Sequence, residues 1–155
     1  MQEVKITKSM MEDASARAKE MGVLKNSISK GRGNVAGMLG EEIVLKVLGG
    51  KLKSNYEYDI ILPDGSTTDV KTKLTTVKPQ PEYSCSVSAY NIHQKCDSYT
   101  FVRVKKDLTI GWYLGMLSKL DFFNAARFVE KGTVDPTNDY KAKSSCFNCP
   151  ISLLQ

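Results

Sequence analysis

The feature that most constrains the fold is the turn sequence Pro63-Asp64-Gly65-Ser66, which separates two runs rich in apolar and β-branched residues. Residues 58–62 and 67–74 flank it, and this arrangement is typical of a β-hairpin. Asp59 lies in the first run and Asp69 in the second. A carboxylate within an apolar strand costs desolvation free energy unless it is paired. The hairpin therefore predicts two acidic side chains that lie close together and need a cation.

Lys71 follows Asp69 at a spacing of two residues. Side chains alternate between the faces of a strand, so Asp69 and Lys71 share one face. Two carboxylates and a lysine at a sheet edge suit a hard divalent cation and an activated water, which is the equipment for phosphodiester hydrolysis. The alternative interpretation is an ordinary solvated strand face that carries Lys71 and Lys73.

Glu41 lies within a predicted helix over residues 34–48, in the helical sector that holds most of the apolar side chains. That sector is expected to face the sheet, so Glu41 points inward and needs a partner. The partner is either a metal ion or a lysine of the sheet such as Lys71. Gly37 and Gly40 on this helix predict a close approach to the strands.

Periodicity and breakers along the rest of the chain predict a mixed α/β or α+β class. Helices are expected over residues 8–22, 34–48 (with Asn34 as N-cap and Gly49-Gly50 as the stop) and 120–129. Residues 86–95 predict a short strand that passes into a helix over residues 89–94. Strands are expected over residues 51–54, 58–62, 67–74, 99–104 and 109–117. The length predicts one domain over residues 1–155, divided into an N-terminal helix and basic loop (1–33), a core (34–105) and a cysteine-containing C-terminal part (106–155).

Three short motifs in this order resemble the PD-(D/E)xK nuclease superfamily: Gly40-Glu41, Tyr58-Asp59-Ile60 and Asp69-Val70-Lys71. The resemblance covers residues 33–105 and implies a restriction-endonuclease-like core, which is a central mixed sheet flanked by helices. Tyr58 stands where many members of the superfamily have a proline. The motifs are degenerate, and their combination and order carry the likeness.

The resemblance implies the ligands of a Mg²⁺ or Mn²⁺ ion. Asp59 and Asp69 would bind the ion directly, and the carbonyl of Val70 would be a third ligand. Glu41 would bind a second ion directly or through water.

The resemblance also implies a catalytic role for Lys71, which would orient the attacking water and stabilise the transition state. Gln94 resembles a glutamine that supports the site in some members of the superfamily. The implied activity is that of a structure-selective or weakly sequence-specific DNA endonuclease, similar to a Holliday-junction resolvase or a phage nuclease. Its implied substrate is duplex or branched DNA, and a homodimer that cuts both strands is compatible with this activity.

The net charge of +5 and the sequence pI of about 9.0 favour a polyanionic partner. A basic, hydroxyl-rich loop before the second helix is expected to contact phosphate, and Lys51, Lys53, Lys73 and Lys78 are expected to extend a basic rim around the site. The predicted nucleic-acid-binding residues are Ser27, Ser29, Lys30, Arg32, Asn34 and Lys73. The sequence shows no secretory signal and no apolar run that could cross a bilayer, so a soluble, intracellular (cytoplasmic) protein without a membrane partner is expected.

Four cysteines in a reducing compartment are expected to be thiols or metal ligands rather than disulfides. His93 with Cys96, and Cys146 with Cys149, form two pairs whose spacing is compatible with a structural Zn²⁺ site. Three functions therefore stay open: the nuclease, a non-catalytic nucleic-acid-binding module on the same fold, and a zinc-stapled interaction domain. An RNA substrate is compatible with the same residues.

Overall fold

The structure is a computed structural model of the chain, and it describes residues 1–21, 32–53, 55–134 and 141–155. The helices are α1 (Lys8–Met21), α2 (Arg32–Leu48) and α3 (Lys119–Ala125), with the 3₁₀ turns η1 (Ala89–Asn91) and η2 (Ile151–Leu153). The strands are β1 (Gln2–Lys5), β2 (Lys51–Leu52), β3 (Ile60–Ile61), β4 (Thr67–Thr75), β5 (Ser84–Ser88), β6 (Ser98–Lys105), β7 (Ile110–Ser118), β8 (Arg127–Val129) and β9 (Cys146–Pro150).

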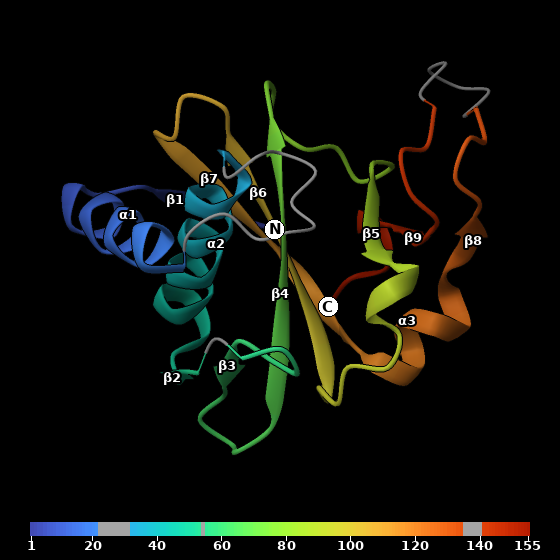
Figure 1. Cartoon of the computed structure of the whole chain (residues 1–155), viewed down its shortest axis with the longest axis horizontal. Coiled ribbons are helices and arrows are strands. Elements are labelled where there is room, and N and C mark those ends of the chain that lie inside the picture. The colour runs from blue at the N-terminus through green and yellow to red at the C-terminus, as the bar shows by residue number, and fades with distance from the viewer. Residues whose placement is uncertain (22–31, 54, 135–140) are drawn as a thin grey trace.

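The described elements form three layers (Figure 1). A six-stranded sheet in the order β1-β7-β6-β4-β3-β2 lies in the centre. Only β4 and β6 pair in parallel in this sheet, so it is mixed. The helices α1 and α2 lie on one side of it, and α3 with the antiparallel sheet β5-β9-β8 lies on the other. The predicted mixed α/β class is confirmed.

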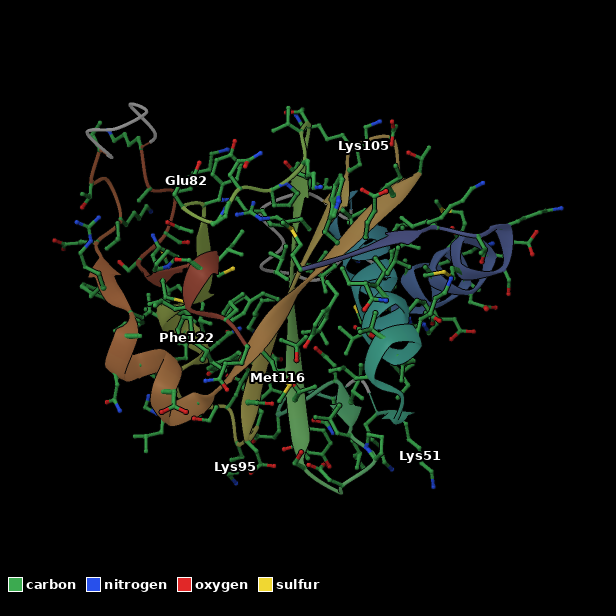
Figure 2. The ribbon with its side chains drawn as sticks, turned by 180° about the vertical axis from the view of Figure 1, so that it is seen from behind. Lys51, Glu82, Lys95, Lys105, Met116 and Phe122 are labelled. Atoms are coloured by element: carbon green, nitrogen blue, oxygen red, sulfur yellow. The ribbon has the colours of Figure 1, made fainter. Side chains whose placement is uncertain are left out.

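Each face of the central sheet has its own apolar core. The α2 side contains Leu39 and Ile43 from the helix together with Val102 from β6, all fully or almost fully buried. The opposite side contains Phe101 from β6 and Phe122 from α3, whose rings stack with centroids 5.5 Å apart. Phe122 lies between α3 and the central sheet (Figure 2). Burial of these side chains fixes both outer layers on the sheet.

Strand β4 contributes different side chains to the two faces. Val70 packs against the α2-side core, and Thr72 lies against Gly40 of α2. Because faces alternate along a strand, Asp69 and Lys71 point to the opposite side. A Cβ atom added to Gly40 would lie 1.9 Å from Thr72 Oγ1, so the predicted close approach exists at Gly40. At Gly37 the prediction is wrong, since nothing lies within 4 Å of such an atom.

The second helix ends as predicted, because Gly49 and Gly50 have positive φ angles of 74° and 109°. It begins earlier than predicted, at Arg32, so Asn34 lies inside its first turn and is not the N-cap. The short strand predicted at the start of residues 86–95 is present as the end of β5, but the helix predicted over residues 89–94 is reduced to the single 3₁₀ turn η1.

The predicted helix over residues 120–129 is wrong at its C-terminal end. α3 stops at Ala125, and Ala126 has extended backbone angles (φ −81°, ψ 143°). Residues 127–129 form β8, which pairs with β9. The sequence prediction also missed β1 and β9. These short strands are stabilised by distant partners, β7 for β1, and β5 and β8 for β9, and local sequence does not specify such pairing.

Among the described residues, no helix is both long enough and apolar enough to cross a membrane.

The contact between α2 and β4 can be tested with two matched glycine substitutions. Gly40→Ala should lower the free energy of unfolding by about 1–3 kcal/mol, because its methyl group overlaps Thr72. Gly37→Ala, on the same helix but in open space, should leave it unchanged or raise it by up to about 1 kcal/mol. Urea denaturation measures both, and adding Thr72→Ala to Gly40→Ala should recover part of the loss. Equal effects of the two alanines would contradict the close approach.

Candidate active site

The Asp59 carboxylate accepts a hydrogen bond from the backbone of β4 at the point where β3 and β4 separate. β3 pairs with β4 only over Ile60–Ile61, and the Asp59 amide still donates to the Thr68 carbonyl at 3.0 Å. One step further, the Val70 amide donates to Asp59 Oδ2 at 2.8 Å. A buried amide needs an acceptor, so this bond gives the Asp59 carboxylate a fixed place beside β4.

Asp69 and Lys71 lie on the same face of β4 and form an ion pair between Asp69 Oδ2 and Lys71 Nζ. Asp69 is 4% exposed. Its Oδ2 atom is buried and accepts no hydrogen bond with good geometry from the described residues. The ammonium of Lys71 also lies 5.7 Å from the centre of the Tyr99 ring. The predicted shared face of Asp69 and Lys71 is therefore present.

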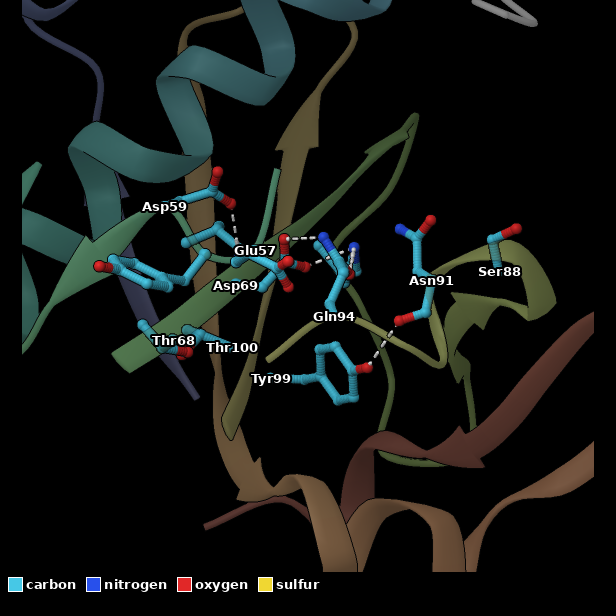
Figure 3. A network of polar contacts seen from close by, with 12 residues as sticks. Glu57, Asp59, Thr68, Asp69, Ser88, Asn91, Gln94, Tyr99 and Thr100 are labelled. Atoms are coloured by element: carbon cyan, nitrogen blue, oxygen red, sulfur yellow. Dashed lines mark hydrogen bonds and ion pairs between the residues drawn. The ribbon is translucent and has the colours of Figure 1, made fainter. Parts of the chain in front are cut away.

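Gln94 joins these two side chains, and Figure 3 shows it beside Asp69. Its Nε2 donates to Asp69 Oδ1 at 2.9 Å, and its Oε1 accepts from Lys71 Nζ at 3.2 Å. The same Nε2 donates to the carbonyl of Tyr56 at 2.7 Å, which fixes the amide orientation. Gln94 reaches the site from the loop between η1 and β6, not from the face of a helix as predicted.

Glu41 is 7% exposed on α2, so the inward orientation predicted for it is correct. Its Oε2 accepts from Arg17 Nη1 at 2.6 Å, and Arg17 Nη2 also contacts Glu42 Oε1 and the Met38 carbonyl, each at 3.0 Å. The described cation beside Glu41 is thus an arginine of α1, not a lysine of the sheet.

The sequence reasoning missed Arg17. It follows Met10 and Ala14, both buried on α1, at helical spacings of three and four residues. That spacing places Arg17 on the buried stripe of α1, and it is the signal that could have identified an inward arginine.

The carboxylates repel one another across the site. Burial, followed by the negative charges of Asp69 and Glu41, raises the pKa of Asp59 to about 7. The Val70 amide and Lys71 act in the opposite direction but do not compensate. Asp59 is therefore a carboxyl group whose ionised form needs another cation nearby.

No three His, Cys, Asp or Glu side chains lie close enough together to hold a metal ion within residues 1–21, 32–53, 55–134 and 141–155. For Mg²⁺ this leaves the predicted ligands Asp59 and Asp69 usable, since Mg²⁺ is commonly held by one or two carboxylates and several waters. The Val70 amide binds Asp59, and the predicted role of the Val70 carbonyl stays a prediction.

The four residues predicted to bind zinc are not assembled into one group. Cys146 and Cys149 are three residues apart on β9, so they point to opposite faces. Cys149 is buried opposite Cys85 of β5, and burial raises the pKa of Cys149 to about 11. His93 is exposed, whereas Cys96 is buried in the core on the α3 side.

The predicted nucleic-acid-binding loop lies mostly outside the described residues. Ser27, Ser29 and Lys30 belong to that part, and nothing is described of the Arg32 side chain. Asn34 is half-buried in α2. Lys73 lies on β4, two residues beyond Lys71 and therefore on the same face.

No model of a known protein family matches this chain, and no curated protein matches it at a significant level.

The Arg17–Glu41 ion pair should contribute measurably to stability. Arg17→Gln should lower the free energy of unfolding by about 2–4 kcal/mol, because the buried Glu41 carboxylate loses its arginine. Glu41→Gln in the same chain should restore part of this loss. Lys8→Gln, which breaks the exposed Lys8–Glu12 pair of α1, should cost about 0.5 kcal/mol or less. Chemical denaturation measures the set, and equal losses for Arg17→Gln and Lys8→Gln would contradict the assignment.

The raised pKa of Asp59 predicts a pH dependence of stability with a defined sign. Below about pH 4 the carboxyl is protonated in both folded and unfolded chains, and above about pH 7 it is ionised in both. Between these values the folded chain holds the proton more tightly, so the wild type should lose up to about 4 kcal/mol of stability relative to Asp59→Asn as pH rises.

Asp97 supplies a control of opposite sign. Hydrogen bonds from the Thr67 side chain and amide lower the pKa of Asp97. The wild type should therefore gain stability relative to Asp97→Asn as pH rises through about 4. Thermal unfolding in EDTA, from well below the usual Asp pKa of 3.8 to above pH 7, measures both differences. If the difference in stability between the wild type and Asp59→Asn does not change with pH, the assigned environment of Asp59 is contradicted.

Proposed function

We propose that the chain is a divalent-metal-dependent phosphodiesterase that cleaves DNA. The observation that carries this proposal is the hydrogen bond of the Val70 amide to Asp59, which puts a second carboxylate beside the Asp69–Lys71 pair. A buried acid, a half-buried acid and a lysine that lie together beside β4 are suited to a cation and an anionic substrate. Gln94 supports the same interpretation, because it holds the acid and the lysine in one network.

The residues present fit a Mg²⁺ or Mn²⁺ ion. Lys71 Nζ already forms an ion pair with Asp69 Oδ2, whereas burial and the charges of Asp69 and Glu41 raise the pKa of Asp59. The raised pKa of Asp59 indicates negative charge that Lys71 does not fully compensate. Asp59 and Asp69 would hold the ion, with Glu41 acting through water or at a second ion. Such an ion acts as a Lewis acid and lowers the pKa of a bound water.

Lys71 is the residue of the chain placed to act on the reacting phosphate. Gln94 and Asp69 fix its ammonium, which can hold an attacking water and stabilise charge on the phosphate oxygens. Arg17 is a positioning residue for Glu41 in this proposal, since it binds that carboxylate from the neighbouring helix.

The order of elements supports the resemblance to the PD-(D/E)xK nucleases. α2 precedes the hairpin β3–β4, and the chain then crosses over to β6, which is parallel to β4. A restriction-endonuclease-like core has this order but a helix in the crossover, where this chain has β5 and the short turn η1. Structure-selective or weakly specific cleavage, by a monomer or a homodimer, is part of the same proposal.

A second candidate is a non-catalytic nucleic-acid-binding module. The observation that favours it is that Lys71 and Gln94 already bind Asp69, so the cluster is partly satisfied without a metal ion. This candidate predicts salt-sensitive binding that does not depend on divalent cations.

Cleavage of plasmid, linear and four-way-junction DNA with Mg²⁺ or Mn²⁺ separates the two candidates. The wild type should cut, and Asp69→Asn or Lys71→Gln should reduce the rate by at least about 100-fold, as loss of a group that stabilises the transition state does. The matched controls Asp13→Asn and Lys46→Gln, at exposed positions on α1 and α2, should cut at the wild-type rate.

All variants should keep the wild-type circular dichroism spectrum. Metal-independent binding with no cleavage of any DNA would overturn the nuclease proposal and favour the binding module. Parallel reactions with RNA would show whether the substrate is the other nucleic acid.

A further inference from the structure

A groove with a volume of about 1440 Å³ runs along the α3 side of β4, beginning at Lys71. Lys73 on β4 and Arg103 on β6 line one wall, and residues of β5, β8 and β9 line the other. Sites for small molecules have volumes of about 300–1,000 Å³, so this groove is large enough for part of a polymer. Because Lys71 lines the groove and also contacts Asp69, the groove leads into the candidate active site.

The groove has a buried positive charge in its wall. Arg103 is 7% exposed, and its Nη2 donates to the Ser84 carbonyl at 2.7 Å. Within the described residues it forms no ion pair with a carboxylate. Its register partner across the parallel pair is Lys73, another cation. Burial and the charge of Arg103 lower the pKa of Lys73. A buried cation beside a second cation is costly unless an anion binds there.

The other described charges that line the groove cancel in number, because Arg127 of β8 and Lys143 are matched by Glu82 and Glu130. With Lys71, Lys73 and Arg103 included, the described lining has five cationic and two acidic side chains. This excess favours a polyanion.

Exposed aromatic rings lie along the same groove. Phe128 of β8 is 53% exposed, and one neighbour of its ring is Phe147 at a centroid distance of 5.2 Å. Tyr83, which lies just before β5, is 37% exposed. Rings that keep an open surface beside cations are the components on which unpaired bases stack while the backbone is held by charge.

We propose that this groove binds single-stranded nucleic acid and leads it to Lys71 and Asp69, an inference that rests on the proposed phosphodiesterase function. The phosphates would lie along Lys73 and Arg103, and bases would stack on Phe128. A duplex fits the groove less well, because its bases are already stacked on one another and have no free face for Phe128. The substrate of the site is then a single strand, or a duplex that carries a single-stranded end or flap.

Fluorescence anisotropy in EDTA tests this inference without cleavage. The probes are labelled oligothymidine, oligouridine and a blunt hairpin duplex, with unlabelled polyglutamate as an acidic competitor. The single strands should bind at least about 10-fold more tightly than the duplex, as expected when stacking contributes to only one of them. The two single-stranded probes show whether the ribose 2′-hydroxyl is tolerated.

Three substitutions in the groove and one outside it localise the binding. Lys73→Gln should weaken single-strand binding and lower the salt slope by about 0.7. Phe128→Ala should weaken it by about 5-fold or more and leave duplex binding unchanged. Arg103→Met should weaken it while keeping the melting temperature at or above that of the wild type, because it removes a buried charge. Lys19→Gln, at an exposed lysine of α1, should have no effect.

Equal affinity for single strand and duplex would overturn the inference. So would full displacement by polyglutamate at the same concentration of charge, or equal losses in the Lys73→Gln and Lys19→Gln variants. If Arg103→Met does not fold, the Lys73 and Phe128 variants decide alone. Binding in the groove without cleavage of any nucleic acid would defeat the proposed function and leave the groove assignment standing. If the groove variants cleave DNA at the wild-type rate, the proposed function would stand and the groove assignment would be overturned.

Discussion

The candidate site depends on one hydrogen bond, from the Val70 amide to the Asp59 carboxylate. β3 pairs with β4 for only two residues before the strands separate, and the separation would leave a backbone donor of β4 without an acceptor. The side chain of Asp59 supplies that acceptor. The hydrogen bond from the Val70 amide therefore holds the Asp59 carboxylate in place. It keeps Asp59 near Asp69 although the two negative charges repel each other.

β4 serves two purposes because its side chains alternate. On one face Thr72 packs against Gly40, at a distance that admits no larger residue, and this fixes α2 with Glu41 against the sheet. On the other face Asp69, Lys71 and Lys73 follow one another at two-residue intervals. The parallel register places Lys73 beside Arg103 of β6, so the line of charge continues onto the next strand. Substitutions on the two faces should therefore affect different properties, stability on the α2 face and binding or chemistry on the other.

The sequence predicted the parts of this arrangement that depend on local signals. The turn at residues 63–66 and the glycines after α2 act within a few residues, and the two-residue spacing of Asp69 and Lys71 determines their shared face. The burial of Glu41 followed from helical periodicity, but its contact with Arg17 joins residues 24 positions apart. Nothing local specifies such a contact.

The same reasoning explains the errors. Gln94 was predicted on the face of a helix, yet it reaches Asp69 from a loop whose path is fixed by the amide's bond to the Tyr56 carbonyl. Residues 127–129 were predicted as helix, although they pair with β9, a strand that carries no alternation strong enough to recognise. Arg103 lies beside Lys73 because β4 and β6 pair in parallel, and local sequence does not specify that pairing.

The distribution of charge over the α3 side of the sheet has a common physical basis. Buried ions of either sign reduce stability unless an opposite charge compensates them. Here acids gather at one end of β4, where Asp59 has a pKa of about 7, and cations extend from Lys71 along the groove to a buried arginine. A bound cation at the acids and a phosphate chain along the groove would compensate both ends together. One ligand pair of this kind would remove both costs, and under the proposed function the site and the groove would form a single binding surface.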